Sequence, residues 1–151
     1  LVIGIPMGVY AALRRGTFLS QVFMTISLLG VSLPTFLIGI LLILIFAVWL
    51  NWLPASGWGK PERWILPIIA YAAIPIATYA RYTRSVMLDT LSRPFVTALR
   101  AKGLSERRVV WTHAWRNALF PVITLFGLWL PLLVTGSVFV EMVFAWPGLS
   151  R

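Results

Sequence analysis

RPFVTALRAKGLSERRVVWTHAWRNALFP, residues 93–121, is the one long polar interval in a sequence that otherwise consists of apolar runs. It contains many basic residues and a single carboxylate, Glu106. Its apolar residues recur at three- and four-residue steps, the spacing of one face of a helix. A chain needs only a few residues to turn between two spans, so a long interval with helical periodicity predicts a folded segment with a purpose of its own.

The composition places the chain in a membrane. Of its 151 residues, 60% are hydrophobic and 11% are charged, and the mean hydropathy is +0.89, which exceeds what a soluble core requires. Cysteine is absent, which excludes disulfides, thiolate metal sites and a cysteine nucleophile. The net charge of +9 does not predict nucleic-acid binding, because the basic residues cluster between apolar runs, where the positive-inside rule accounts for them.

Apolar runs long enough to cross a bilayer alternate with polar intervals. Residues 1–13 are fewer than the roughly 20 that a span needs, so we expect a partial span there. Complete spans are predicted at about 22–50, 64–82 and 118–140, with a polar loop at about 87–117. The run at 22–50 is longer than a perpendicular crossing, and we expect tilt or a kink at Pro34 to absorb the excess. We expect the chain to be part of a single transmembrane domain that lacks both ends.

The distribution of charge predicts which loops are cytoplasmic. Arg81–Arg116 carries eight basic residues against Asp89 and Glu106, a net charge of +6, whereas the loop at 51–63 carries +1. Basic residues are enriched on the cytoplasmic side of a membrane protein. The polar loop is therefore predicted to lie in the cytoplasm.

The polar loop itself predicts two short helices. Phe95–Lys102 has helical spacing, and Gly103 supplies the glycine that is typical of a helix end. Ser105 is a plausible N-cap of a second helix, with Glu106 in its first turn, where a negative charge meets the helix dipole. A weakly polar stripe then recurs at helical spacing: Val109, Val110, His113, Ala114 and Asn117. Such a helical pair fits either a groove on another protein or an anionic lipid surface, and the residues alone favour neither.

The sequence lacks the residues that other chemistries need. The four carboxylates, at positions 62, 89, 106 and 141, all fall in or beside predicted loops, so no proton relay within the spans is indicated. A lone histidine, His113, is more typical of a packing residue than of a metal ligand or a base. There is no G-x-x-x-x-G-K-[ST] run, so any ATP is expected to be bound by another subunit. We expect no catalytic residues, no metal and no cofactor in this chain.

The segment TALRAKGLSERRVVWTHAWRNALFPVIT, residues 97–124, resembles the cytoplasmic EAA loop of ABC-transporter inner-membrane permeases, in the form found in the dipeptide/oligopeptide branch. Further stretches are similar to recurring landmarks of that branch and follow one another in the same order. They are Gly4–Pro6, Ala11–Gly16, Ser32–Pro34, Trp52–Gly57 and Glu141–Leu149.

The resemblance implies an all-α polytopic transmembrane bundle whose cytoplasmic loop docks in a cleft of an ATPase. Thr97, Ala98 and Leu99 occupy the E-A-A positions, and Gly103 is the motif glycine. Thr97 replaces the acidic residue and Arg116 stands where the general motif has proline, and both departures look usual for the peptide branch. The other residues that the resemblance assigns to ATPase coupling are Ala101, Lys102, Leu104, Ser105, Arg107, Arg108, His113 and Asn117.

The implied function is that of a permease subunit in an ATP-driven importer of di- or oligopeptides, or of a related small solute, in the bacterial cytoplasmic (inner) membrane. The implied partners are a second permease subunit, two cytoplasmic ATPase subunits and an extracytoplasmic solute-binding protein, besides membrane lipid. The alternatives are a secondary transporter or channel subunit, an intramembrane enzyme, or a nickel- or glutathione-type substrate within the same permease family. The substrate-binding residues are not predicted.

Overall fold

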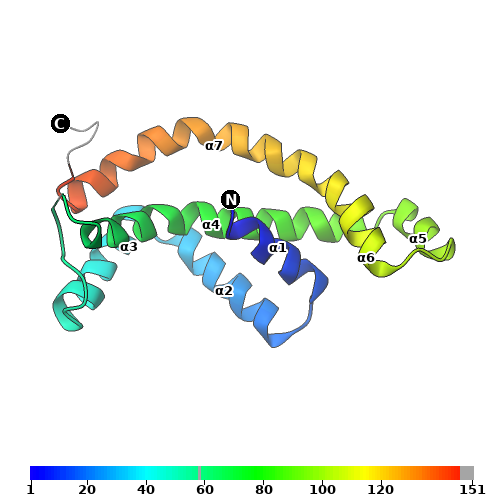
Figure 1. Cartoon of the computed structure of the whole chain (residues 1–151), viewed down its shortest axis with the longest axis horizontal. Helices are drawn as coiled ribbons and strands as arrows, with labels where there is room; N and C mark the ends of the chain where they lie inside the picture. The colour runs from blue at the N-terminus through cyan, green and yellow to red at the C-terminus, as the bar shows by residue number, and fades with distance from the viewer. Residues whose placement is uncertain (58, 147–151) are drawn as a thin grey trace. The chain divides into compact units, whose positions relative to one another are not determined.

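All the regular secondary structure is helical in the residues that the structure, a computed structural model, describes, namely 1–57 and 59–146 (Figure 1). The predicted all-α fold is therefore confirmed. Trp58 and residues 147–151, which include the last part of the Glu141–Leu149 landmark, lie outside the described residues. The helical elements, in chain order, are α1 (Gly4–Leu13), α2 (Phe18–Ser32), α3 (Thr35–Leu42), η1 (Ile43–Trp49), α4 (Glu62–Leu91), α5 (Pro94–Ala101), α6 (Glu106–Arg108), η2 (Val109–Ala114) and α7 (Trp115–Val143).

One described helix, α4, is by itself long and apolar enough to cross a membrane, and up to three crossings are present if bent pairs of helices are each counted as one. α4 begins close to the predicted start of the span at 64–82 but continues to Leu91. The extension is helical because one of its faces is buried: Thr83, Met87 and Thr90, spaced four and three residues apart, are at most 2% exposed. Which residues lie in the bilayer remains a prediction.

The predicted span at 22–50 is divided into α2, α3 and the π-helical segment η1. The chain turns through 109° at the break between Ser32 and Thr35. Pro34 has an extended ψ of 144°; it has no N–H to continue the hydrogen bonding of α2, and it disfavours helical geometry at the residue before it. The expected kink is thus at Pro34 but is sharper than a tilted span requires, and it fits a broken span or a re-entrant segment.

The chain forms two compact units, and unit 1 consists of residues 1–27 and 76–128. In it α1 approaches α4 with almost no clearance. A Cβ atom on Gly4 would lie 2.7 Å from the carbonyl oxygen of Ile76, and one on Gly8 would lie 2.5 Å from that of Ala80. Small residues four apart permit such backbone contact between membrane helices. Sequence reasoning missed this pair, although its Gly-x-x-x-Gly spacing was visible.

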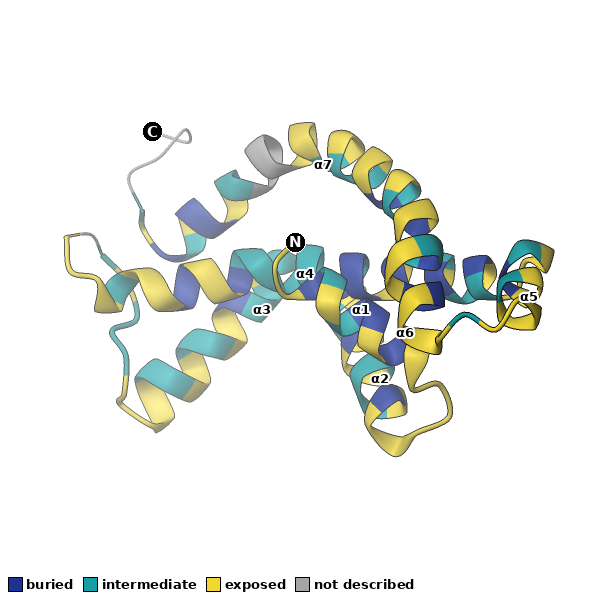
Figure 2. Ribbon diagram, turned by 45° about the vertical axis from the view of Figure 1, so that its right-hand side comes forward, coloured by how far each residue is buried: buried dark blue, intermediate teal, exposed yellow. Residues whose placement is uncertain are grey.

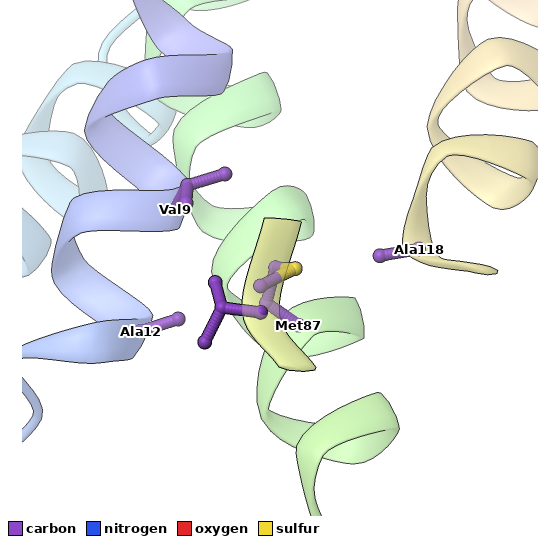
Figure 3. Packing of buried hydrophobic residues seen from close by; sticks show 5 residues of the cluster. Val9, Ala12, Met87 and Ala118 are labelled. Atoms are coloured by element: carbon purple, nitrogen blue, oxygen red, sulfur yellow. The ribbon is translucent and has the colours of Figure 1, made fainter. Parts of the chain in front are cut away.

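The core of unit 1 joins four elements through small and flexible side chains. Val9 and Ala12 from α1, Met87 from α4, Val110 from η2 and Ala118 from α7 form one buried cluster (Figure 3). Met87 is fully buried, and its unbranched thioether suits the irregular gap between helices. The cluster fixes the C-terminal part of α4 and the start of α7 on α1.

Unit 2 consists of residues 28–75 and 129–151, of which the structure describes all but Trp58 and residues 147–151. Leu66 and Ala70 of α4 pack with Val140 of α7 and with Phe144, and side chains of α3 and η1 surround them. Glu141, predicted to stand in or beside a loop, lies in the last turn of α7, which ends at Val143. Its burial was not predicted from the sequence: it is only 9% exposed.

The contact between α1 and α4 predicts a difference between two identical substitutions. Gly8→Ala places a methyl group against the α4 backbone, so we expect it to destabilise the protein by about 1–3 kcal/mol through overpacking. Gly127→Ala adds the same group in α7 where nothing lies within 4 Å, and it should be neutral or stabilising by up to about 1 kcal/mol. Thermal unfolding of the detergent-solubilised full-length proteins measures both. Equal midpoints for the two variants would contradict the packing described.

Candidate coupling segment

The first half of the predicted coupling loop is helix α5. It spans Pro94–Ala101, within one residue of the predicted Phe95–Lys102. Pro94 occupies the first helical position, where the missing N–H costs nothing and the fixed φ suits the helix. Just before it, Arg93 donates a hydrogen bond of 2.9 Å to the carboxylate of Asp89 at the end of α4. The passage from α4 to α5 is therefore short and held by a local ion pair.

The turn after α5 closes as a Schellman motif around Gly103. The Gly103 N–H donates to the Arg100 carbonyl at 2.9 Å, and the Leu104 N–H donates to the Leu99 carbonyl at 3.3 Å, which satisfies the last carbonyls of the helix. Gly103 has φ +80°, in the left-handed region that favours glycine. Nothing lies within 4 Å of the position of a Cβ there. The glycine is therefore required by backbone geometry and not by crowding.

An ion pair clips the two sides of this turn together. Arg100 donates from Nε to Oε1 of Glu106 at 2.6 Å and from Nη2 to Oε2 at 3.2 Å, the bidentate geometry that suits a guanidinium and a carboxylate. These hydrogen bonds lower the pKa of the Glu106 carboxyl below its usual 4.5. Ser105 does occupy the N-cap position, but its side chain makes no capping hydrogen bond. Glu106 thus serves the turn in addition to the helix dipole.

The second half of the loop is not a separate helix. α6 and η2 continue without a break into α7, so the predicted boundary between the loop and the span at 118 is not a structural boundary. Of the predicted stripe, Val109, Val110 and Ala114 are buried within unit 1, Val110 in the cluster with Met87. The stripe packs on its own chain, which corrects the expectation that it would lie against a partner or lipid.

The residues that the resemblance assigns to coupling lie mostly at the surface. α5 is largely exposed, whereas its Val96 is fully buried (Figure 2). Three assigned residues are half-buried: Leu99, Leu104 and His113. The exposed ones are Thr97, Ala98, Ala101, Lys102, Gly103, Ser105, Arg107, Arg108, Arg116 and Asn117. α5 has one exposed face of small side chains, formed by Thr97, Ala98 and Ala101. Ala101 follows Ala98 by three residues and Thr97 by four, the spacing that places side chains on one face of a helix.

Two residues near this segment escaped the sequence reasoning. A cavity of about 390 Å³ lies beside the Arg100–Glu106 pair and is lined in part by Arg15, from the turn between α1 and α2, and by Leu88 of α4. Arg15 is far away in sequence, and no local pattern pointed to it. In the described part of the chain, no three His, Asp or Glu side chains gather as metal ligands would.

Comparison with known proteins identifies the family. Residues 4–151 match the family described as the binding-protein-dependent transport system inner membrane component. The chain belongs to this family. The resemblance seen in the loop and its landmarks is thereby confirmed, and the helical architecture of this inner-membrane family agrees with the fold.

Relatives within the family carry transport names. The chain is 43% identical to the dipeptide transport system permease protein DppB of Bacillus subtilis, with 98% of the chain and 48% of the relative covered. It is 40% identical to the di/tripeptide transport system permease protein DppB of Pseudomonas aeruginosa (98% and 52% covered), and 42% identical to the glutathione transport system permease protein GsiC of Escherichia coli K12 (100% and 49% covered). The chain spans about half the length of these curated relatives.

The ion pair between Arg100 and Glu106 predicts that the stability of the turn depends on pH. Because the pKa of Glu106 is lowered in the folded protein, the stabilisation is fully present above about pH 4.5 and is lost as the pH falls through the lower, folded pKa. We expect amide hydrogen exchange across residues 100–106 to accelerate at low pH in the wild type relative to Glu106→Gln measured at the same pH.

The exchange difference should be small and should shrink with salt, because both side chains are substantially exposed. Glu106→Gln should exchange faster than the wild type at neutral pH and converge with it at low pH. A difference that persists unchanged to pH 3 would show that the ion pair does not hold the turn.

Proposed function

We propose that this chain forms part of a permease subunit of an ATP-driven importer that moves di- or oligopeptides, or a related small solute, across the bacterial cytoplasmic membrane. The observation that carries the proposal is the family match over residues 4–151. The names of the relatives support the solute class, since they refer to dipeptides, di- and tripeptides, and glutathione. Glutathione is itself a small peptide, so one chemical class covers all three names.

The proposed role of α5 and the following turn is to contact a cytoplasmic ATPase subunit. The exposed face of Thr97, Ala98 and Ala101 supports this role, because small side chains let a partner approach a helix closely. Lys102, Arg107 and Arg108 surround the turn with positive charge, which would complement an acidic rim on the partner. The turn is itself fixed by the Schellman hydrogen bonds and the Arg100–Glu106 clip.

The competing interpretation places this segment on anionic lipid. Helices that lie in the bilayer interface present large apolar residues such as Trp, Phe and Leu. The exposed face of α5 lacks these residues, and the valines and the alanine of the apolar stripe, which would suit either surface, are packed within unit 1. The geometry of α5 therefore supports a protein partner over a lipid surface.

Linkage between the segment and the spans is also part of the proposal. α4 runs as one helix to Leu91, three residues before α5 begins, and the helical run from Glu106 continues through α7. A force on α5 would reach both long helices through short, hydrogen-bonded connections. A second permease subunit, two ATPase subunits and an external solute-binding protein complete the proposed assembly, and ATP is bound and hydrolysed outside this chain.

The proposal predicts a specific loss on substituting Gly103. Proline cannot adopt φ +80° and has no N–H for Arg100, so Gly103→Pro deforms the turn. We expect co-purification of the ATPase subunit with the full-length permease to fall about tenfold or more, the effect of losing roughly 1.4 kcal/mol of binding, and uptake of a labelled dipeptide to fall with it.

The matched control is Gly16→Pro, which introduces the same conflict at another exposed glycine with φ +85° and no neighbour within 4 Å. Gly16→Pro should retain the ATPase subunit. The amount of each variant in the membrane shows whether both are made. The coupling role is refuted if Gly103→Pro retains the ATPase and transports normally, and a permease that takes up dipeptide without any ATPase would instead favour a secondary carrier.

A further inference from the structure

Unit 2 contains a cavity with a buried acid at its wall. The cavity has a volume of about 290 Å³ and is lined by Pro67 and Tyr71 of α4, by Ser137, Val140 and Glu141 of α7, and by Trp146, among others. Glu141 is 9% exposed, so more than nine-tenths of it is removed from solvent. No Lys or Arg is among the described lining residues. The cavity therefore combines an apolar wall with one acidic group.

A buried acidic residue in a membrane protein indicates a site. Removing a carboxylate from water is costly, so ionisable residues in such positions commonly face a cavity and mark a solute or ion path. A carboxylate offers about four acceptor positions, so Glu141 can accept hydrogen bonds from a ligand in addition to any partner within the chain. The ligand that such a group selects is a cation that can donate several hydrogen bonds.

The aromatic residues of the cavity favour the same class of ligand. Trp146 and Tyr71 both line it, and the faces of aromatic rings attract cations, most strongly in desolvated sites. The Trp146 ring packs edge to face on Trp64, with centroids 6.3 Å apart. The backbone N–H of Trp146 donates a hydrogen bond of 2.9 Å to the backbone carbonyl of Glu141. Trp146 is thus held to the same turn that carries the carboxylate.

Backbone strain occurs at this turn. Ala145, between Phe144 and Trp146, has φ +51°, a left-handed conformation that residues other than glycine and asparagine seldom adopt. Strained residues of this kind persist where the surroundings hold them and cluster at ligand sites. Here the strain accompanies the placement of Trp146 at the cavity wall.

We propose that this cavity binds the ammonium group and first side chain of a peptide substrate. Glu141 accepts hydrogen bonds from the ammonium, the rings of Tyr71 and Trp146 add cation–π attraction, and the apolar wall around Pro67 and Val140 receives the side chain. The size supports one residue and not a whole oligopeptide, because about 290 Å³ is at the lower limit of pockets for small ligands. This inference rests on the proposed peptide import and adds the part of the peptide that the permease recognises.

The test compares two ligands that differ only in the ammonium. The full-length permease, assembled with its ATPase subunits in lipid nanodiscs and without a solute-binding protein, is titrated with Leu-Ala and with N-acetyl-Leu-Ala while tryptophan fluorescence is recorded. We expect Leu-Ala to bind roughly ten- to hundredfold more tightly, the range set by charge-assisted hydrogen bonds. Trp146→Phe should lose most of the fluorescence change, which locates the ligand at this cavity.

Two matched variants examine the acid. Glu141→Gln should bind both dipeptides with similar, weak affinity, whereas Glu62→Gln, the same change at an exposed position at the start of α4, should keep the preference for the free ammonium. Two results with the wild type alone overturn the inference: equal binding of the two dipeptides, or no binding of either. Absence of binding is the result expected if another segment of the permease subunit fills the cavity. A Glu141→Gln protein that keeps the preference overturns it as well.

Dipeptide uptake by the complete importer separates this inference from the function on which it rests. If dipeptide uptake is normal, and neither Glu141→Gln nor N-acetylation of the dipeptide changes it, the importer function stands and only the ammonium site is refuted. Absence of any dipeptide uptake by the wild-type assembly removes the proposed function itself.

Discussion

The last carbonyl groups of a helix have no partner within the helix, and the way in which they are satisfied shapes the ends of α5 and α7. At the ends of α5 and α7, the last carbonyl groups accept hydrogen bonds from backbone N–H groups just beyond the helix. The residue in the left-handed conformation is Gly103 after α5 and Ala145, which is strained there, after α7. At Pro34 the ladder stops because proline lacks a donor, and the chain turns there. The proposed coupling residues lie at the first of these closed ends, and the proposed ammonium site lies at the second.

Packing in unit 1 explains how a surface segment gains a fixed position. Val110 joins Val9 and Met87 in the core, so the start of the long run into α7 is anchored on α1 and α4. The close backbone contact at Gly4 and Gly8 in turn holds α1 against α4. α5 then projects from an anchored base, attached through a hydrogen-bonded turn on one side and the Arg93–Asp89 pair on the other. The exposed face of α5 owes its position to residues that are buried within unit 1.

Local backbone chemistry was predictable from the sequence, and long-range packing was not. The limits of α5, the glycine at its end and the position of Ser105 follow from rules that span four or five residues, and the structure agrees with them. The Arg100–Glu106 pair crosses a turn, and the burial of Val109 and Val110 depends on helices many residues away, so periodicity gave the stripe but not the surface that it contacts. The burial of Glu141 was not predicted for the same reason, since it depends on α4 and on Trp146.

The length of α4 has a consequence for the segment that follows it. α4 has thirty residues, whereas a helix needs only about twenty to cross a hydrocarbon core of about 30 Å. A crossing by α4 would therefore leave roughly ten helical residues outside the acyl chains, enough for the turn into α5 to be made by backbone that water can reach.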